Sequence, residues 1–227
     1  SQTLNRTSLS GGKKSLDLPA SNLQEPAQSL DNNYVVLARK WRPAQFTDIV
    51  GQNHVIKTMV NAITSQRIHQ AYLMTGSRGI GKTSIARIFA KAVRCQSLTS
   101  DVNSCGVCSS CREITLSTSV DVIEIDGASN NGVDAVREIR ESAKFLPALG
   151  GRKIYIIDEV HMLSKSAFNA MLKTLEEPPE HVVFILATTD VQKVPITILS
   201  RCLQLKLRNL SAAEIEQHLR YVLEQEQ

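Results

Sequence analysis

Residues 76 to 83 read GSRGIGKT, which has the G-x-x-x-x-G-K-[ST] spacing of a phosphate-binding loop. Glycines at these positions let successive backbone N–H groups turn inward around a phosphate, and a helix that begins at the loop adds the partial positive charge of its N-terminus. Lys82 is expected to neutralise the β- and γ-phosphate oxygens, and Thr83 to offer its hydroxyl to Mg²⁺. A chance glycine-rich turn is disfavoured, because a strand pattern precedes the loop and a helical pattern follows it. We assign nucleotide contacts to Gly76, Ser77, Arg78, Gly79, Ile80, Gly81, Lys82, Thr83 and Ser84.

An acidic pair, Asp158 and Glu159, follows the apolar run KIYII. A phosphate loop binds a nucleotide but does not hydrolyse it, so other residues must reach the metal and the attacking water. We expect Asp158 to reach Mg²⁺, directly or through water, and Glu159 to orient or deprotonate the attacking water. An acidic pair after a strand is by itself usually a solvated strand end, but the intact loop upstream favours the catalytic interpretation. This interpretation requires Lys82 and Glu159 to lie at one edge of the sheet. It also expects the strand before the phosphate loop to be adjacent to the strand that carries the acidic pair.

The run VVFILATTD ends in Thr188, Thr189 and Asp190. If this strand neighbours the strand that carries Asp158, a threonine hydroxyl there could contact the γ-phosphate or the attacking water. The same polar residues could instead simply begin a turn. Spacing alone leaves both interpretations open.

The composition constrains the number of domains, the contact with nucleic acid and the location of the protein only loosely. A chain of 227 residues with 42% hydrophobic residues can bury a sizeable core, so one domain with appendages is expected. The net charge of +4 permits contact with nucleic acid without requiring it. The basic residues Arg137, Arg140 and Lys144 could face DNA phosphates or form the solvated face of a helix. No apolar run is long enough to span a membrane and no signal peptide is recognisable, so we expect a cytoplasmic protein without a membrane partner.

Four cysteines, Cys95, Cys105, Cys108 and Cys111, could form a disulfide staple, a metal site or a group of small buried residues. In a reducing cytoplasm paired cysteines are more often metal ligands than disulfides. The C-x-x-C-x-x-C spacing with one further ligand suits tetrahedral Zn²⁺, whereas an iron–sulfur cluster lacks a redox partner in this chain. A closed shell of four thiolates leaves no open position, so this metal would be structural. Cys202 is expected to be a packed free thiol.

Short strand-like runs alternate with helical patterns. The runs lie at residues 71–75, 120–126, 153–158 and 182–189, and an alternating run follows at 203–207. This alternation predicts an α/β fold with a mostly parallel sheet that helices cover on both faces. Ser211 and Glu214 form a capping box that begins a last helix, whereas residues 1–33 read as a disordered tail or linker. Apolar residues recur at helical spacing in the sets Val55, Ile56, Met59, Val60 and Ile63; Ile85, Ile88, Phe89 and Ala92; Val136, Ile139, Ala143 and Leu146; and Phe168, Met171, Leu172 and Leu175.

Several stretches together resemble the tau/gamma subunits of the bacterial DNA polymerase III clamp loader, a family of AAA+ ATPases. They are YVVLARKWRPAQFTDIVGQNHV, TGSRGIGKTSIARIFAKAVRC, CGVCSSC, IIDEVHMLSKSAFNAMLKTLEEPPEHVVFILATTD and PITILSRC. The resemblance runs from about Tyr34 to the end of the chain. It implies an AAA+ P-loop NTPase domain at residues 34–208, a four-cysteine zinc module at 95–111 and the first helix of a helical lid at 209–227.

The resemblance also implies residue roles. The family's Walker A motif falls on residues 76–83 and its Walker B motif on Asp158 and Glu159. The sensor threonine falls on Thr188 or Thr189, of which we choose Thr189. Arg201, within Ser-Arg-Cys, would complete the ATP site of a neighbouring subunit; without the resemblance, a surface salt bridge would be the simpler interpretation. Four cysteines in nearly this pattern hold zinc in that family.

The function implied is that of an ATPase motor subunit of the replicative clamp loader, acting as part of a DNA polymerase holoenzyme. Its cofactors would be ATP, Mg²⁺ and Zn²⁺, and its partners the other clamp-loader subunits, the sliding clamp and primed DNA. One alternative is another AAA+ motor, for branch migration or helicase loading, against which the four-cysteine insertion argues. A second is a zinc-containing DNA-binding module with a vestigial nucleotide site, against which the intact Lys82, Thr83, Asp158 and Glu159 argue.

Overall fold

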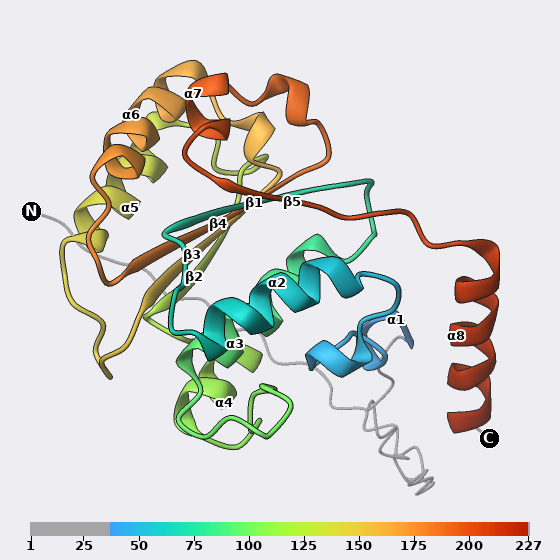
Figure 1. Cartoon of the computed structure of the whole chain (residues 1–227). Coiled ribbons are helices and arrows are strands. Elements are labelled where there is room, and N and C mark those ends of the chain that lie inside the picture. Colours follow the sequence, from blue (N-terminus) through green and yellow to red (C-terminus); the bar gives the residue numbers. More distant parts are fainter. Residues whose placement is uncertain (1–36, 227) are drawn as a thin grey trace, which may run out of the picture. The chain divides into compact units, whose positions relative to one another are not determined.

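The computed structural model of the chain describes residues 37 to 226, which form a parallel sheet with helices on both sides (Figure 1). The predicted tail, residues 1–33, lies outside the described residues. The strand order is β2-β3-β4-β1-β5. The strands are β1 (Ala71–Thr75), β2 (Val122–Asp126), β3 (Lys153–Asp158), β4 (Val182–Thr188) and β5 (Leu203–Lys206).

The central strands β1, β3 and β4 are buried, and the strands pair in parallel. Because successive side chains of a strand point to opposite faces, Tyr72 and Met74 join the core on one face and Ala71 and Leu73 the core on the other. A strand buried on both faces must be apolar along its length, as these runs are. The predicted α/β class with a parallel sheet is confirmed.

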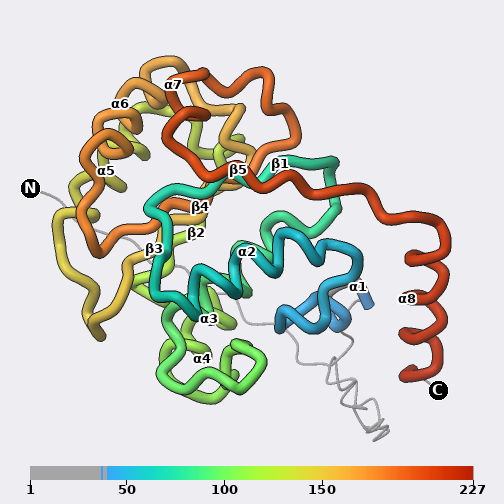
Figure 2. Tube along the Cα trace, in the orientation of Figure 1, coloured from blue at the N-terminus to red at the C-terminus, as the bar shows by residue number. Residues whose placement is uncertain are grey.

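Helices cover both faces of the sheet (Figures 1 and 2). Helices α2 and α3 contribute to one core, and α5, α6 and α7 to the other. The helices are α1 (Leu37–Lys40), α2 (Asn53–Thr64), α3 (Lys82–Arg94), α4 (Ser109–Thr115), α5 (Val133–Ala143), α6 (Lys165–Glu176), α7 (Ile196–Leu199) and α8 (Ala212–Gln225). Short 3-10 helices are η1 (Phe46–Asp48), η2 (Val160–Met162) and η3 (Val191–Lys193).

The strand that carries the acidic pair is not adjacent to the strand before the phosphate loop, so that prediction was wrong. β4 pairs with β1 on one side and with β3 on the other. Hydrophobic periodicity reveals the type of an element but not its place in the sheet, which the crossover connections decide. The carboxyl ends of these three parallel strands still share one edge. β3 and β4 are neighbours, as the interpretation of the threonines required.

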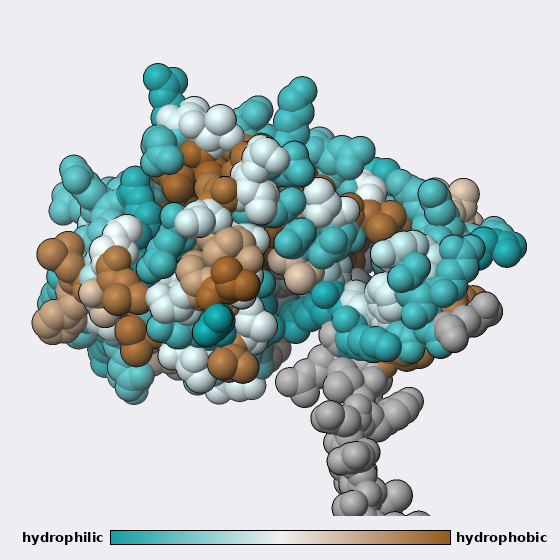
Figure 3. All heavy atoms as spheres, turned by 90° about the horizontal axis from the view of Figure 1, so that it is seen from below, coloured by the Kyte–Doolittle hydropathy of each residue, from teal (hydrophilic) through white to brown (hydrophobic). Residues whose placement is uncertain are grey.

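The predicted apolar stripes of α3 and α6 lie in the two cores. One prediction at the end of α5 was wrong: Leu146 lies beyond Ala143, the last helical residue, and is 76% exposed. Pro147 disfavours the helical conformation for the residue before it, so the stripe cannot continue to Leu146. In the view of Figure 3, apolar side chains form separate patches among polar ones. Among the described residues, no helix has the length and apolar character to cross a membrane.

Helix α8 begins with the predicted capping box. The Ser211 hydroxyl accepts a hydrogen bond from the Glu214 N–H, and the Glu214 carboxylate accepts one from the Ser211 N–H. No residue of α8 is buried, and Leu219 remains 56% exposed. The helix is held instead by Trp41, which packs edge-on against Tyr221 and donates from Nε1 to the Glu226 carboxylate at 2.7 Å. Assignment of residues 209–227 to a lid stays a prediction.

A buried ion pair fixes the C-terminal end of α3. Arg94 donates from Nη2 to Asp121 Oδ2 at 2.7 Å, and the two side chains are 3% and 4% exposed. Asp121 also accepts from the Ala148 N–H, and Arg94 donates to the carbonyls of Gly150 and Arg152. The pair therefore ties α3 to the residues before β2 and to the loop before β3.

We predict that Asp121→Ala lowers the free energy of unfolding by about 3–5 kcal/mol, because it leaves the Arg94 guanidinium buried without its counter-charge. Chemical denaturation measures the change. The control is Asp134→Ala, which removes the exposed ion pair with Arg137 and should cost about 0.5 kcal/mol or less. Equal losses for the two variants would contradict the prediction.

Candidate functional site

The phosphate-binding loop connects the end of β1 to the start of α3. Gly81 is the N-cap of α3 with φ +101°, a conformation that residues with a Cβ rarely adopt. The sharp turn there lets the unpaired N–H groups of the first helical turn face the loop. Ser77, Arg78 and Gly79 are exposed at the tip of the loop. The strand, loop and helix that the motif requires are all present.

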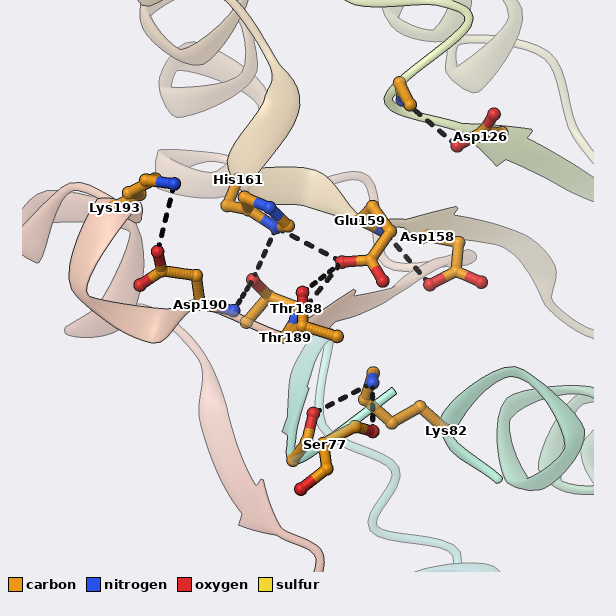
Figure 4. A network of polar contacts seen from close by, with 12 residues as sticks. Ser77, Lys82, Asp126, Asp158, Glu159, His161, Thr188, Thr189, Asp190 and Lys193 are labelled. Atoms are coloured by element: carbon orange, nitrogen blue, oxygen red, sulfur yellow. Dashed lines mark hydrogen bonds and ion pairs between the residues drawn. The ribbon is translucent and has the colours of Figure 1, made fainter. Parts of the chain in front are cut away.

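Lys82, the first residue of α3, is only 5% exposed. Its Nζ donates to the carbonyl oxygens of Gly76 and Ser77, each at 2.9 Å (Figure 4). Burial lowers the pKa of Lys82, while the nearby Glu159 and Asp158 carboxylates act in the opposite direction and favour the ammonium. Lys82 and Glu159 therefore lie at the same edge of the sheet, within electrostatic reach of one another.

Thr83 and Asp158 meet directly. The Thr83 hydroxyl donates to Asp158 Oδ2 at 2.5 Å, and Asp158 Oδ1 accepts from the Glu159 N–H at 2.9 Å. A hydroxyl and a carboxylate side by side are hard oxygen ligands of the kind that Mg²⁺ prefers beside nucleotide phosphates. The two halves of the predicted site thus touch, although β4 separates their strands.

Glu159 has the left-handed backbone conformation, with φ +45° and ψ +46°. Its Oε2 accepts from the Thr189 N–H at 3.2 Å and from the Thr189 hydroxyl at 2.9 Å. Thr189 therefore lies beside Glu159, on the edge where a γ-phosphate or an attacking water would stand. Thr188 instead is fully buried and its Oγ1 accepts from the Asp190 N–H. The placement of the two threonines favours the choice of Thr189.

Sequence reasoning missed His161. Its Nδ1 lies 3.2 Å from Glu159 Oε2 and 3.0 Å from Thr188 Oγ1 (Figure 4). The only sequence signal is a histidine that follows the acidic pair closely within the otherwise apolar segment VHML. That signal is weak, because periodicity does not show that η2 folds His161 back onto the end of β3.

Gly127 allows the end of β3 to take its shape. Its N–H donates to the Asp158 carbonyl at 2.8 Å. A Cβ at this position would lie 2.8 Å from the Glu159 carbonyl oxygen and 2.9 Å from that of Asp158. Any larger residue must therefore displace the backbone that carries the acidic pair.

Two arginines lie near the phosphate loop: Arg42, beside the first turn of α3, and Arg87, within α3. Arg42 donates from Nε to the Ser84 hydroxyl at 3.1 Å. Arg87 binds the Glu124 carboxylate with two hydrogen bonds, at 2.5 and 2.7 Å. Burial, and then the charge of Arg87, lower the pKa of Arg42. These groups extend the polar surroundings of the loop toward β2.

Arg201 is not brought together with the loop or the acidic pair. It donates to Glu176 Oε1 at 2.7 Å and to the Thr197 carbonyl at 2.7 Å. Its side chain is 33% exposed and that of Glu176 50%. Within the described residues, Arg201 thus forms a surface salt bridge with Glu176, as the sequence suggested in the absence of the resemblance. A role of Arg201 in the ATP site of a neighbouring subunit stays a prediction.

The four clustered cysteines lie after the end of α3 and around the start of α4. Their sulfur atoms all lie within 4.8 Å of one another. Hydrogen bonds from the Cys108 and Val107 N–H groups lower the pKa of the Cys105 thiol to about 6, whereas burial raises that of Cys111 to about 12. The arrangement is compatible with a bound metal ion. Cys202 lies apart, and burial raises the pKa of its thiol to about 11.

The basic residues Arg137 and Arg140 in α5, and Lys144 directly after it, pair with acidic neighbours. Arg137 contacts Asp134, and both Arg140 and Lys144 contact Glu141, all on exposed side chains. These pairs favour the interpretation of a solvated helix face over that of a DNA contact.

A family model described as DNA polymerase III, delta subunit, matches residues 51–211. The chain belongs to this DNA polymerase III delta subunit family. Over 194 residues it is 54% identical to DNA polymerase III subunit tau of Escherichia coli (strain K12), which covers 86% of this chain and 30% of that protein. It is 54% identical over 192 residues to subunit gamma of Buchnera aphidicola subsp. Acyrthosiphon pisum, covering 84% of this chain and 53% of that protein. It is 51% identical over 195 residues to subunit tau of Bacillus subtilis, covering 86% of this chain and 34% of that protein.

The resemblance to tau/gamma subunits of DNA polymerase III is therefore confirmed, and the chain spans about a third to a half of the length of these relatives. A solved structure titled Thermotoga maritima RuvB Holliday junction branch migration motor is 20% identical, with a TM-score of 0.55, covering 78% of this chain and 52% of that one. Similarity at this level shows a shared fold alone. Membership of the DNA polymerase III family favours the clamp-loader interpretation of the sequence over that of a branch-migration motor.

We predict that Gly127→Ala destabilises the protein by about 1–3 kcal/mol, because the new methyl group overlaps the carbonyl oxygens of Asp158 and Glu159. The control is Gly132→Ala, whose Cβ meets nothing within 4 Å and which should stay within about 1 kcal/mol of the parent protein. Urea denaturation compares the two. The close-approach argument fails if both substitutions have the same effect.

Proposed function

We propose that the chain is the ATP-hydrolysing region of a motor subunit of the replicative clamp loader, part of a DNA polymerase holoenzyme. The observation that carries the proposal is the convergence of the phosphate loop with the acidic pair, closed by the hydrogen bond from Thr83 to Asp158. The clamp, the primed DNA and the other loader subunits enter through the resemblance to tau/gamma subunits. ATP binding would hold an assembly that opens the ring-shaped clamp, and hydrolysis would release it.

The loop and α3 bind the triphosphate. The N–H groups at the start of α3 point toward the phosphates, and Lys82, held close by the Gly76 and Ser77 carbonyls, neutralises their charge. Thr83 and Asp158 would hold Mg²⁺, which when bound neutralises charge on the β- and γ-phosphates. Ser84, which accepts from Arg42, continues the polar surface beside the loop.

Glu159 acts on the attacking water. Thr189 binds one carboxylate oxygen, and among the described residues the other, Oε1, has no hydrogen-bond partner. The free oxygen is available to accept a hydrogen bond from a water molecule and so to turn it toward the γ-phosphate. Thr189 is therefore the sensor residue in this proposal.

Arg201 acts on a neighbouring subunit. Its guanidinium lies at the surface, and an exposed ion pair such as the one with Glu176 is weak and readily exchanged. A triphosphate presented by a neighbour carries more charge than Glu176 and can replace it. Negative charge on the transferring phosphoryl group would then be stabilised from outside, so hydrolysis would require assembly.

The four cysteines bind zinc as a structural ion. A tetrahedron of Zn–S bonds of about 2.3 Å places its sulfur atoms about 3.8 Å apart, which the cluster matches with little movement. A cluster of several iron atoms would hold the thiolates farther from one another. The polar segment between α3 and α4 buries too little to fold by itself, so the metal supplies the free energy that orders it.

We predict that Lys82→Ala weakens ATP binding by about 30-fold or more, because it removes a buried cation that would face the phosphates. Fluorescent-nucleotide titration of the isolated chain measures this. Unchanged ATP affinity would contradict the assignment of the loop.

We predict that Arg201→Ala keeps ATP affinity but lowers turnover of the assembled loader by about 10³-fold at the site it would complete. The assay uses complexes reconstituted with partner subunits. Arg220→Ala, at another exposed arginine in an ion pair, is the matched control and should leave turnover unchanged. The role in the neighbouring site is wrong if Arg201→Ala turns over ATP as fast as the control.

We predict about one zinc ion per purified chain, which Cys111→Ser loses because a hydroxyl is a poor fourth ligand in a thiolate shell. Elemental analysis measures the content, and thiol titration before and after a chelator counts the protected cysteines. Cys202→Ser is the control and should retain the ion. Metal-free protein with all four clustered thiols reactive would exclude the site.

A further inference from the structure

His161 lies between the proposed catalytic carboxylate and the end of β4. Its Nδ1 is 3.2 Å from Glu159 Oε2 and 3.0 Å from Thr188 Oγ1. The histidine side chain is 9% exposed and Thr188 is fully buried. Figure 4 shows the imidazole beside Glu159 and above Thr188, away from Lys82 and Asp158. A buried ring with two polar contacts at one nitrogen is held in a single orientation.

The contact with Glu159 indicates which ring nitrogen carries a proton. Glu159 Oε2 is an acceptor, so an unprotonated Nδ1 at 3.2 Å would set two lone pairs against each other. A protonated Nδ1 donates to Oε2, and Thr188 Oγ1, which already accepts from the Asp190 N–H, can share the same proton. The contact with Glu159 therefore indicates a hydrogen on Nδ1.

Three donors then converge on one oxygen of Glu159. Two come from Thr189, its N–H and its hydroxyl, and the third comes from His161. A glutamate side chain has three rotatable torsions, and its orientation is lost unless contacts restrain it. Because the three donors fix the position of Oε2, they also fix the direction in which the other carboxylate oxygen, Oε1, points.

We propose that His161 is a positioning residue for Glu159, which orients the carboxylate through Nδ1–H and couples it to the buried hydroxyl of Thr188. This inference rests on the proposed function, since it assigns Glu159 to the attacking water. In the part of the chain that the structure describes, the hydrogen bond and ion pair of His161 go to Thr188 and Glu159, and none goes to the phosphate loop or Thr83. Its loss therefore affects the chemical step and leaves nucleotide binding intact.

The test compares His161→Leu with His161→Asn in the assembled loader. Leu fills much of the space without a donor, and kcat should fall between about 10- and 100-fold because the carboxylate is misplaced, with KM for ATP unchanged. The Asn side-chain N–H₂ stands close to the position of Nδ1 and should restore most of kcat. Equal kcat for Leu and the parent protein, or no recovery with Asn, would overturn the proposal. So would a rise in KM at constant kcat.

A matched control and a second measurement separate this role from general stability. His181 is a part-buried histidine that contacts the Ala143 carbonyl at 2.9 Å, and His181→Leu should leave kcat unchanged. ATP affinity of the isolated His161→Leu chain, equal to that of the parent, establishes that it folds. Nitrogen-15 chemical shifts of the parent protein should show hydrogen on Nδ1 of His161. An unprotonated Nδ1 would overturn the proposal without any reference to turnover.

The two proposals fail in different ways. If the parent assembly does not hydrolyse ATP, the proposed function is wrong, and the inference about catalysis falls with it. If the parent assembly hydrolyses ATP and His161→Leu does so equally fast, only the positioning role is wrong.

Discussion

The hydrogen bond from Thr83 to Asp158 joins the two halves of the site, and the rest of the structure determines whether it can form. Thr83 lies in α3, which follows β1, and Asp158 ends β3. The strands β1 and β3 are not neighbours, because β4 lies between them. Helix α3 bridges the gap by packing over the sheet, with Phe89 edge-on against Tyr72 at a centroid distance of 5.1 Å. The apolar face that buries α3 thus also sets the distance between hydroxyl and carboxylate.

The end of β3 is shaped by constraints that oppose ordinary backbone preferences. Glu159 takes a left-handed conformation that costs on the order of 1 kcal/mol or more for a residue with a side chain. Contacts around Glu159 offset this cost. The Thr189 N–H and hydroxyl bind its carboxylate, and Gly127, which has no Cβ, leaves room for its backbone. The strain turns the side chain of Glu159 toward β4 while Asp158 faces α3.

The parts of this protein that were predictable from sequence are those encoded by local patterns. The loop around Lys82 and the four cysteines could be located from spacing, because the backbone geometry of a turn or knuckle is decided within a few residues. The order of the strands could not, since β4 enters the sheet between two strands that precede it in the chain. His161 was missed for a related reason: its significance comes from Thr188 on another strand, and no periodicity links them. Leu146 was misplaced because Pro147 overrides the helical period.

Helix α3 connects the nucleotide site to the cysteine cluster. Its N-terminus carries Lys82 and Thr83, and Cys95 follows its last residue, Arg94. A helix of this length is rigid over about 20 Å, so fixing one end restricts the other. The buried pair of Arg94 with Asp121 already anchors the far end, and four sulfur atoms brought together by a metal would anchor it a second time, in the segment that leads to α4. In the proposed function, a metal bound by the cysteines would therefore restrain the C-terminal end of the helix whose N-terminus carries the phosphate-binding residues Lys82 and Thr83.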